Sequence, residues 1–303
     1  MSLVILIAII PPIIWATVNH IDKFAVDKYM KGRDAGSLVI FTGIAAFIFG
    51  VILHLSGKVS FLPREISFSM ISAGTMLVFS YIPYLYAIKN DEASNVAPLF
   101  QLITPCAYIF SVLFLGEHLS GIQLFAGSMI FFGALVLSFD PHSSKIRSRT
   151  FFLMLTGAVM IALNIVMFKS FAIETDFWTT VYYDLVGATL AGVILFALIK
   201  TYRLSFLGAI KEHGFPVIGV NMFAESANIV ARMISGSVTL LLPIAVIQFI
   251  NGLQPLFILC IGIVLTIFAP RLGKEIISKR VLVQKFSAVF LMVAGFIMLT
   301  LVS

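Results

Sequence analysis

Four polar residues with helical spacing form the part of the sequence best suited to chemistry. Asn221, Glu225, Asn228 and Arg232 follow the spacing i, i+4, i+7, i+11, so on a helix they share one face. A carboxylate flanked by amides and a guanidinium can bind a polar or zwitterionic solute. In apolar surroundings the charged form of a carboxylate is disfavoured, so it can also take up and release a proton.

The rest of the chain shows why such a stripe is unusual. Of the 303 residues, 60% are hydrophobic and 11% are charged, and the mean hydropathy is +1.08. Soluble domains have about 45–50% apolar and about 25% charged residues. A fold in water cannot hide so much apolar surface, which excludes soluble enzymes, nucleic-acid binders and disordered chains. The composition predicts a protein that crosses a membrane several times.

Within a membrane the four residues also have plainer interpretations. Asn221 and Asn228 could join neighbouring helices through hydrogen bonds, and the long side chain of Arg232 could extend to the lipid interface. Glu225 is harder to explain in this way, because a charged group at mid-membrane costs on the order of 3 kcal/mol or more. We therefore expect Glu225 to be functional, and we take it as the candidate for proton coupling.

Ten apolar runs are long enough to form membrane-spanning helices, which need about 20 residues for a hydrocarbon core of about 30 Å. They lie near residues 3–20, 35–55, 66–88, 93–115, 119–138, 151–170, 177–199, 214–235, 238–268 and 281–302. The predicted fold class is therefore an all-α polytopic membrane protein with ten transmembrane helices.

The basic residues indicate an orientation. Of the 20 Lys and Arg residues, 16 lie in the odd-numbered connections between the runs. Such residues concentrate on the cytoplasmic side of a membrane. We therefore expect both termini to lie outside the cytoplasm, and we take the bacterial inner membrane as the location.

Sequence patterns recur in the two halves of the chain. The basic connection 139–150 divides the ten runs into five and five, and the sequence GVIL at 50–53 recurs at 192–195. Because five is an odd number, the second half enters the membrane with the opposite polarity. We predict two inverted five-helix repeats, residues 1–145 and 146–303, an architecture found in many secondary transporters.

The repeat places two tyrosines opposite the polar stripe. In the alignment of the two halves, Tyr81 matches Glu225 and Tyr84 matches Asn228. Both stripes are then expected to face the pseudo-symmetric centre, where they would suit a small polar or zwitterionic solute with an apolar part. The alternative is that both tyrosines belong to the aromatic belt at the membrane interface.

Two prolines mark further candidate positions. A proline in a helix frees the carbonyl group four residues earlier, so Pro105 and Pro255 free those of Gln101 and Asn251. At membrane depth such backbone must be satisfied by protein, polar side chains or water. We expect the fourth and ninth runs to line a cavity, with an ordinary packing kink as the alternative.

Three other polar residues complete the predicted site. Asn19 and Asn164 lie late in the first and sixth runs, and Asp184 lies in the seventh, either as a second ionisable group or as the partner of a basic residue. Glu117, by contrast, is expected to be structural and to cap the fifth run. The predicted substrate-binding residues are Asn19, Tyr81, Tyr84, Gln101, Asn164, Asp184, Asn221, Glu225, Asn228 and Asn251.

A series of motifs between residues 84 and 133 resembles a known family. They are Tyr84-Leu85-Tyr86-Ala87-Ile88, Glu92-Ala93-Ser94-Asn95-Val96-Ala97-Pro98, Thr104-Pro105, Leu115-Gly116-Glu117, Gln123, Gly127 and Gly133. The pattern is similar to that of EamA-type transporters of the drug/metabolite transporter superfamily, and it is weaker in the second half. The resemblance implies ten helices in two repeats around a central cavity, and the transport, commonly the export, of small metabolites. Many members keep both termini in the cytoplasm, the opposite of what the charges here predict.

The leading hypothesis is a secondary transporter or facilitator that exports a small polar or amphipathic metabolite, such as an amino acid, by alternating access. No phosphate-binding loop or hydrolase motif is present in the sequence, and we expect no enzyme activity, no cofactor and no metal. The alternatives are a transporter or flippase of a lipid-like or lipid-linked substrate and, in a different class, an intramembrane enzyme. The expected partners are the substrate, protons and the lipid bilayer, without nucleic acid, for a monomer or homodimer.

Overall fold

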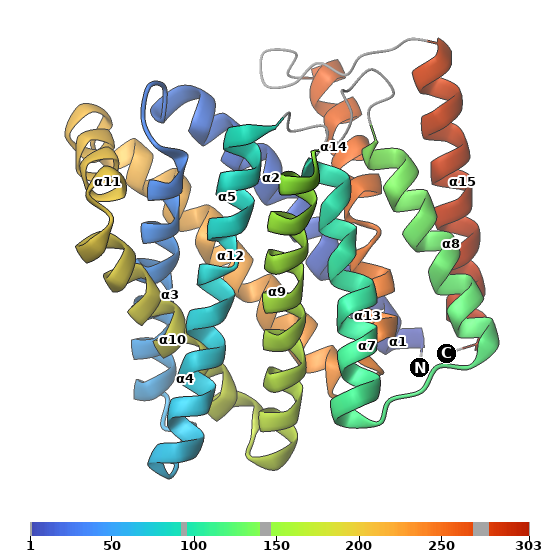
Figure 1. Cartoon of the computed structure of the whole chain (residues 1–303), viewed down its shortest axis with the longest axis horizontal. Coiled ribbons are helices and arrows are strands. Elements are labelled where there is room, and N and C mark those ends of the chain that lie inside the picture. Colours follow the sequence, from blue (N-terminus) through green and yellow to red (C-terminus); the bar gives the residue numbers. More distant parts are fainter. Residues whose placement is uncertain (1, 92–95, 140–146, 269–278, 303) are drawn as a thin grey trace.

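The computed structural model describes residues 2–91, 96–139, 147–268 and 279–302, and these form a bundle of helices (Figure 1). The first half contains α1 (Ser2–Ala8), α2 (Ile10–Tyr29), η1 (Ala35–Leu38), α3 (Val39–Leu55), α4 (Arg64–Phe79), α5 (Tyr81–Asn90), η2 (Ala97–Leu102), α7 (Ile103–Leu115) and α8 (Gly121–Ser138). The second half contains α9 (Ser148–Glu174), α10 (Phe177–Leu198), α11 (Lys200–His213), α12 (Phe215–Thr239), α13 (Ile244–Asn251), α14 (Gln254–Phe268) and α15 (Lys279–Val302).

Ten helical segments are long and apolar enough to cross a membrane, which confirms the predicted fold class. The first segment is longer than its apolar run, because α2 continues through a polar stretch to Tyr29. The ninth is shorter, because residues 238 and 239 complete α12. The helix α11 lies outside these segments and was not predicted.

Five of the spans consist of two helical pieces, and in four of them a proline accounts for the break. α1 ends at Ala8, α4 at Phe79 and α13 at Asn251, each four residues before a proline whose ring cannot accept the preceding helical geometry. In the fourth span the 3₁₀ helix η2 gives way to α7 just after Gln101, four residues before Pro105. The turns that the sequence predicted to be loosened, at Gln101 and Asn251, therefore lie at the breaks.

The helices of the two halves pack against each other in matching pairs. Three pairings join equivalent spans of the two halves: α8 with α15, α3 with α10, and α7 with α13. In the second half α12 packs on α2, and its counterpart is the packing of α4 and α5 on α9. Similarly, α14 packs on α2, and its counterpart is the packing of α7 on α9. Exchanging the first five spans for the last five leaves the first three pairings unchanged and converts each of the remaining pairings into its counterpart. The arrangement fits an inverted repeat, and it supports our proposal that 1–145 and 146–303 are the two repeats.

Small residues bring the central spans close together. A side chain on Gly43 of α3 would lie 2.8 Å from the Cα atom of Gly192 in α10, so the two helices touch through their backbones. Close approach through glycine is a common way for membrane helices to associate, because van der Waals packing replaces the hydrophobic effect there.

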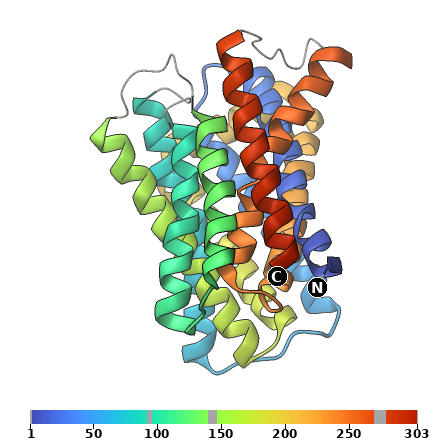
Figure 2. The same cartoon turned by 90° about the vertical axis from the view of Figure 1, so that its right-hand side faces the viewer.

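The two ends of the bundle differ in charge. Both termini lie at one end, together with the connection between α7 and α8 (Figures 1 and 2). We call this the terminal end. The opposite end, which we call the basic end, carries α11 and the start of α9, with Lys31, Arg149, Lys200 and Lys211 exposed on it.

Candidate functional site

An ion pair joins the helices at the centre of the bundle. Asp184 in α10 pairs with Arg232 in α12, and it accepts a hydrogen bond from the Asn164 side-chain nitrogen of α9 at 3.0 Å. The same nitrogen donates to the carbonyl oxygen of Ala73 in α4 at 3.0 Å. Two roles were predicted for Asp184, and in the structure it is the partner of a basic residue. Arg232 points to this partner and not to the lipid interface.

Glu225 lies on the same face of α12, two turns before Arg232. Its carboxyl group lies near the side chains of Thr42 in α3 and Asn228 in α12, and near enough to Asp22 of α2 for the two groups to interact electrostatically. α2 and α12 pack together along this face. Two carboxyl groups therefore lie near each other where α2 and α12 pack together.

Asp22 and Thr42 are site residues that the sequence analysis missed. Asp22 follows the apolar run that ended at residue 20, so it was counted with the basic connection, whereas α2 extends to Tyr29 and carries Asp22 within the helix. Thr42 lies in a strongly apolar segment, where one hydroxyl gives no sequence signal.

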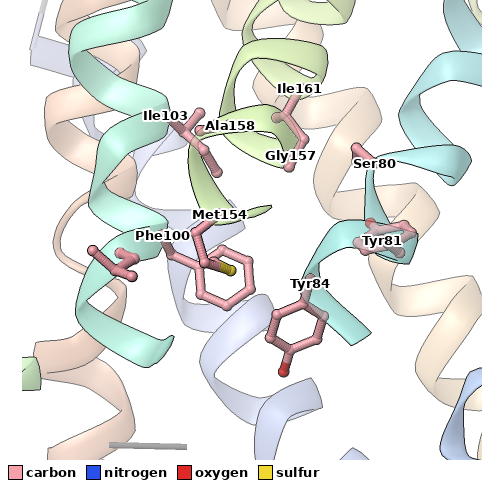
Figure 3. A pocket seen from close by; sticks show the side chains of 10 residues that line it. Ser80, Tyr81, Tyr84, Phe100, Ile103, Met154, Gly157, Ala158 and Ile161 are labelled. Carbon is pink, nitrogen blue, oxygen red and sulfur yellow. The ribbon is translucent and has the colours of Figure 1, made fainter. Parts of the chain in front are cut away.

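Tyr81 connects this charged group to an apolar pocket. It lies within electrostatic range of Arg232, Glu225, Asp22 and Asp184, and it also lines the pocket in Figure 3. The pocket lies between α4–α5, η2–α7 and α9, where the breaks of the third and fourth spans occur. Its lining residues are Ser80, Tyr81, Tyr84, Leu99, Phe100, Ile103, Met154, Gly157, Ala158 and Ile161.

The wall of the pocket is aromatic on one side. The rings of Tyr84 and Phe100 have their centroids 4.8 Å apart and are tilted to each other by 55°. Opposite them, Gly157 of α9 lies so close to the α4–α5 break that a side chain there would lie 3.1 Å from the Ser80 carbonyl oxygen. The lining of the pocket is mostly apolar, and in this conformation its free space is only about that of one water molecule.

Two other predicted residues, Asn221 and Asn19, bond the backbone of their own helices. Asn221 is buried but donates to the Val217 carbonyl oxygen of its own helix at 2.7 Å. Asn19 is exposed and donates to the Trp15 carbonyl oxygen of its own helix at 3.0 Å. These two amides are therefore engaged by helix backbone and not by the charged group.

Two amides lie at the helix breaks. Gln101 is buried in η2, and Asn251 ends α13 with its side-chain nitrogen 3.4 Å from the Ser235 hydroxyl oxygen. The side-chain oxygen of Asn251 is buried and has no hydrogen-bond partner within the described part of the chain. A buried acceptor of this kind is available to a donor on a solute.

A second buried ion pair lies near the terminal end. The Lys169 Nζ atom donates to Glu117 Oε1 at 2.5 Å and to the Leu242 carbonyl oxygen at 2.9 Å, and Glu117 Oε2 accepts from the Ile244 backbone N–H at 2.8 Å. We call this group the terminal clamp. It joins Glu117 of the first half to three residues of the second.

The terminal clamp corrects the role expected for Glu117. The N-terminus of α8 is capped by Ser120 and Gln123, whose side chains each bond the other residue's backbone N–H. Glu117 therefore does not cap the fifth span. It caps α13 in the ninth span, because its second oxygen accepts the first N–H of that helix.

A family model described as the EamA-like transporter family matches residues 2–139. Over these residues the chain is similar to the EamA-like transporters. The match confirms the resemblance predicted from the motifs, and together with ten apolar spans it indicates a multi-pass membrane transporter. Asp22, Thr42 and Tyr81 lie in the EamA-like half, whereas Glu225 and Arg232 lie in the other.

A solved structure described only as "Crystal structure of protein" has a similar fold. It aligns with all of this chain and 98% of its own, with a TM-score of 0.66 and 15% sequence identity. At this identity the likeness shows the fold alone. No curated protein sequence matches the chain significantly.

Proposed function

We propose that this EamA-like protein is a secondary transporter that exports a small amphipathic metabolite, such as an amino acid, by alternating access. The observation that carries the proposal is the position of Tyr81, which lines an apolar pocket and also lies within electrostatic range of acidic and basic side chains. A solute with a charged head and an apolar part matches these two surroundings. A purely apolar solute would leave the charges unused.

The charged group favours a zwitterion over an anion. Asp22, Glu225 and Asp184 carry acidic groups, and Arg232 is the basic residue among them. An ammonium group would be attracted to Glu225 and Asp22, and a carboxylate would share Arg232 with Asp184. The side chain of the solute would then enter the pocket beside Phe100 and Tyr84.

Proton coupling follows from the same arrangement. Two carboxylates that share a desolvated space do not both carry charge without cost, so a proton on Glu225 or Asp22 relieves their repulsion. A bound ammonium group relieves it as well. Proton and substrate therefore compete for one site, and such competition couples their movements when the affinities differ between the two sides of the membrane.

The direct test is counterflow of labelled amino acids into proteoliposomes. We expect uptake of zwitterionic amino acids with apolar side chains, and weaker competition from the same side chain on a carboxylic acid without an ammonium group. Equal competition by the two compounds would contradict the zwitterion site.

The apolar lining of the pocket favours one second candidate, a lipid-like substrate. Its residues Leu99, Ile103 and Ile161 would suit an acyl chain. Reconstituted protein that scrambles labelled lipids between leaflets but shows no amino acid counterflow would select this candidate.

We further propose that the basic end lies in the cytoplasm of a bacterial cell and that both termini lie outside it. The support is that the described basic connections occupy the end opposite the termini. A reporter active only in the cytoplasm, fused to Ser303, is expected to give no signal. A strong signal would reverse the orientation.

A further inference from the structure

The helix α11 is held in a fixed rotation against the basic end of the bundle. Tyr202, Phe206 and Ala209 form its buried face, with spacing i, i+4, i+7. On its flank, Glu212 pairs with Arg33 from the connection after α2, with 2.5 Å between Arg33 Nη2 and Glu212 Oε2. The buried face and the ion pair together decide which residues of α11 point away from the protein.

The outward face of α11 combines two leucines with two lysines. Lys200, Leu204, Leu207 and Lys211 have the spacing i, i+4, i+7, i+11 and are all exposed. Leu204 is 56% exposed and Leu207 is 49% exposed. Neither lysine has an acidic partner within the described ranges. We call these four residues the α11 stripe.

The neighbouring residues place the stripe at the edge of the membrane. Leu198, at the end of α10, is 77% exposed, and Phe215, at the start of α12, is 80% exposed. Both belong to spanning helices whose outer surfaces face hydrocarbon, and α11 connects them directly. With 14 residues, α11 is too short to cross the bilayer itself. It therefore lies where acyl chains meet head groups.

We propose that the α11 stripe is a binding site for anionic phospholipids of the leaflet at the basic end. The two leucines would enter the boundary of the acyl chains, as on helices that lie in the membrane surface. The lysines extend from their apolar stems to the phosphate layer, where each basic residue strengthens the attraction to anionic lipids. The acidic residue of the same turn, Glu212, is neutralised by Arg33 and does not oppose this charge.

Charge and shape favour lipid over a protein partner. The stripe is one residue wide, and lysines stand at both of its ends, an arrangement that matches a row of phosphate groups above acyl chains. It is also continuous with the lipid-facing surfaces of α10 and α12 at Leu198 and Phe215.

The test measures lipid binding to the detergent-purified full-length protein by native mass spectrometry. Phosphatidylglycerol and phosphatidylcholine with identical acyl chains are titrated separately. We expect Lys200→Gln with Lys211→Gln to weaken phosphatidylglycerol binding about tenfold and to leave phosphatidylcholine binding unchanged. Leu204→Ser with Leu207→Ser is expected to weaken the binding of both lipids.

A matched control removes the same charge from the same end. Lys31 and Arg149 are exposed at the basic end but lie outside α11, so Lys31→Gln with Arg149→Gln is expected to keep most of the phosphatidylglycerol affinity. An equal loss in both double variants would overturn the proposal in favour of diffuse attraction. Unchanged phosphatidylglycerol binding in Lys200→Gln with Lys211→Gln would also overturn the proposal. A dimer that disappears in Leu204→Ser with Leu207→Ser, without any change in lipid binding, would assign the stripe to a second copy of the chain.

Discussion

Glu225 of α12 and Asp22 of α2 are two carboxyl groups that lie near enough to interact electrostatically. The side chains of Thr42 and Asn228 also lie near Glu225. A cation that enters would reduce the repulsion between the Glu225 and Asp22 carboxylates. At the scale of single residues, this pair is the centre of the proposed transport chemistry.

The first prediction concerns Asp22. Replacing Asp22 by Asn removes one attraction for an ammonium group, and a hydrogen bond to a charged group contributes about 1.5–3 kcal/mol. We expect Asp22→Asn to weaken substrate binding at least tenfold in a counterflow assay. Asp27→Asn is the control, because Asp27 is an exposed residue of the same helix. Equal effects of the two substitutions would show that Asp22 acts only through overall charge.

The second prediction concerns the ion pair of Asp184 and Arg232. Asp184→Asn leaves the guanidinium without its charged partner in a mostly apolar site, and breaking a buried pair costs about 3 kcal/mol. We expect a lower melting temperature in detergent. The double variant Asp184→Asn with Arg232→Gln removes both charges and is expected to recover part of the loss. A double variant less stable than the single one would contradict this role.

Several residues of the site could be predicted from the sequence, and others could not. Glu225, Asp184 and Arg232 are charged residues inside apolar runs, and the cost of burying charge identifies them. Asp22 lies beyond the point where hydropathy falls, so only the continuation of α2 reveals it. A helical stripe also cannot show that the Asn221 amide bonds the backbone of its own helix.

At the scale of helices and connections, the terminal clamp joins the two halves of the protein. Lys169, with its side chain 9% exposed, and Glu117, at 13%, bond each other and the start of α13. In the alternating-access mechanism that we propose, opening of the terminal end breaks this group. Its strength should therefore influence how often that end opens.

The third prediction tests the terminal clamp. Glu117→Gln keeps the shape of the side chain but leaves the Lys169 ammonium group with only a carbonyl partner. We expect a cysteine placed at Leu242, in a chain with Cys106 and Cys260 replaced by Ser, to react severalfold faster with a membrane-impermeant maleimide. Glu174→Gln, an exposed change near the same end, is the control. Unchanged reactivity in Glu117→Gln would exclude the clamp as a barrier to opening.

The fourth prediction concerns pH and α11. The Arg33 side chain holds the pKa of the exposed Glu212 carboxyl below its usual value of 4.5, first by a hydrogen bond and then with His213 through charge. A lowered pKa means that the tether is present at neutral pH and is lost as the pH falls through the lowered value. We expect a spin label at Leu204 to gain mobility only as the pH falls through this lowered value, which lies below 4.5. In Glu212→Gln the label should be mobile at every pH. A pH transition that persists in this variant would contradict the assignment.

Hydropathy predicted the spans well but missed a helix between them. Proline positions predicted the breaks at Gln101 and Asn251, because a missing N–H and a ring clash act locally. The helix α11 has polar and apolar residues in nearly equal measure, so no apolar run marks it. Glu117 was assigned to the wrong helix, since its partner Ile244 lies 127 residues away and sequence spacing carries no information about that contact.

At the scale of the whole molecule, the two halves contribute different chemistry to one centre. The EamA-like half supplies Asp22, Thr42 and the aromatic wall of the pocket, and the second half supplies Glu225 and Arg232. Their helices pack in pairs that exchange when the halves are exchanged. Successive connections alternate between the two ends of the bundle. The odd-numbered connections, which carry most of the basic residues, therefore all belong to the basic end.

The central claim is that Glu225 couples substrate movement to protons. It is tested most directly by measuring amino acid counterflow and proton-driven uptake in proteoliposomes across pH, with wild type, Glu225→Gln and the control Glu65→Gln, an exposed change on α4. We predict that Glu225→Gln folds normally and abolishes the pH dependence of transport, whereas Glu65→Gln behaves as wild type. An unchanged pH profile and rate in well-folded Glu225→Gln protein would contradict the account.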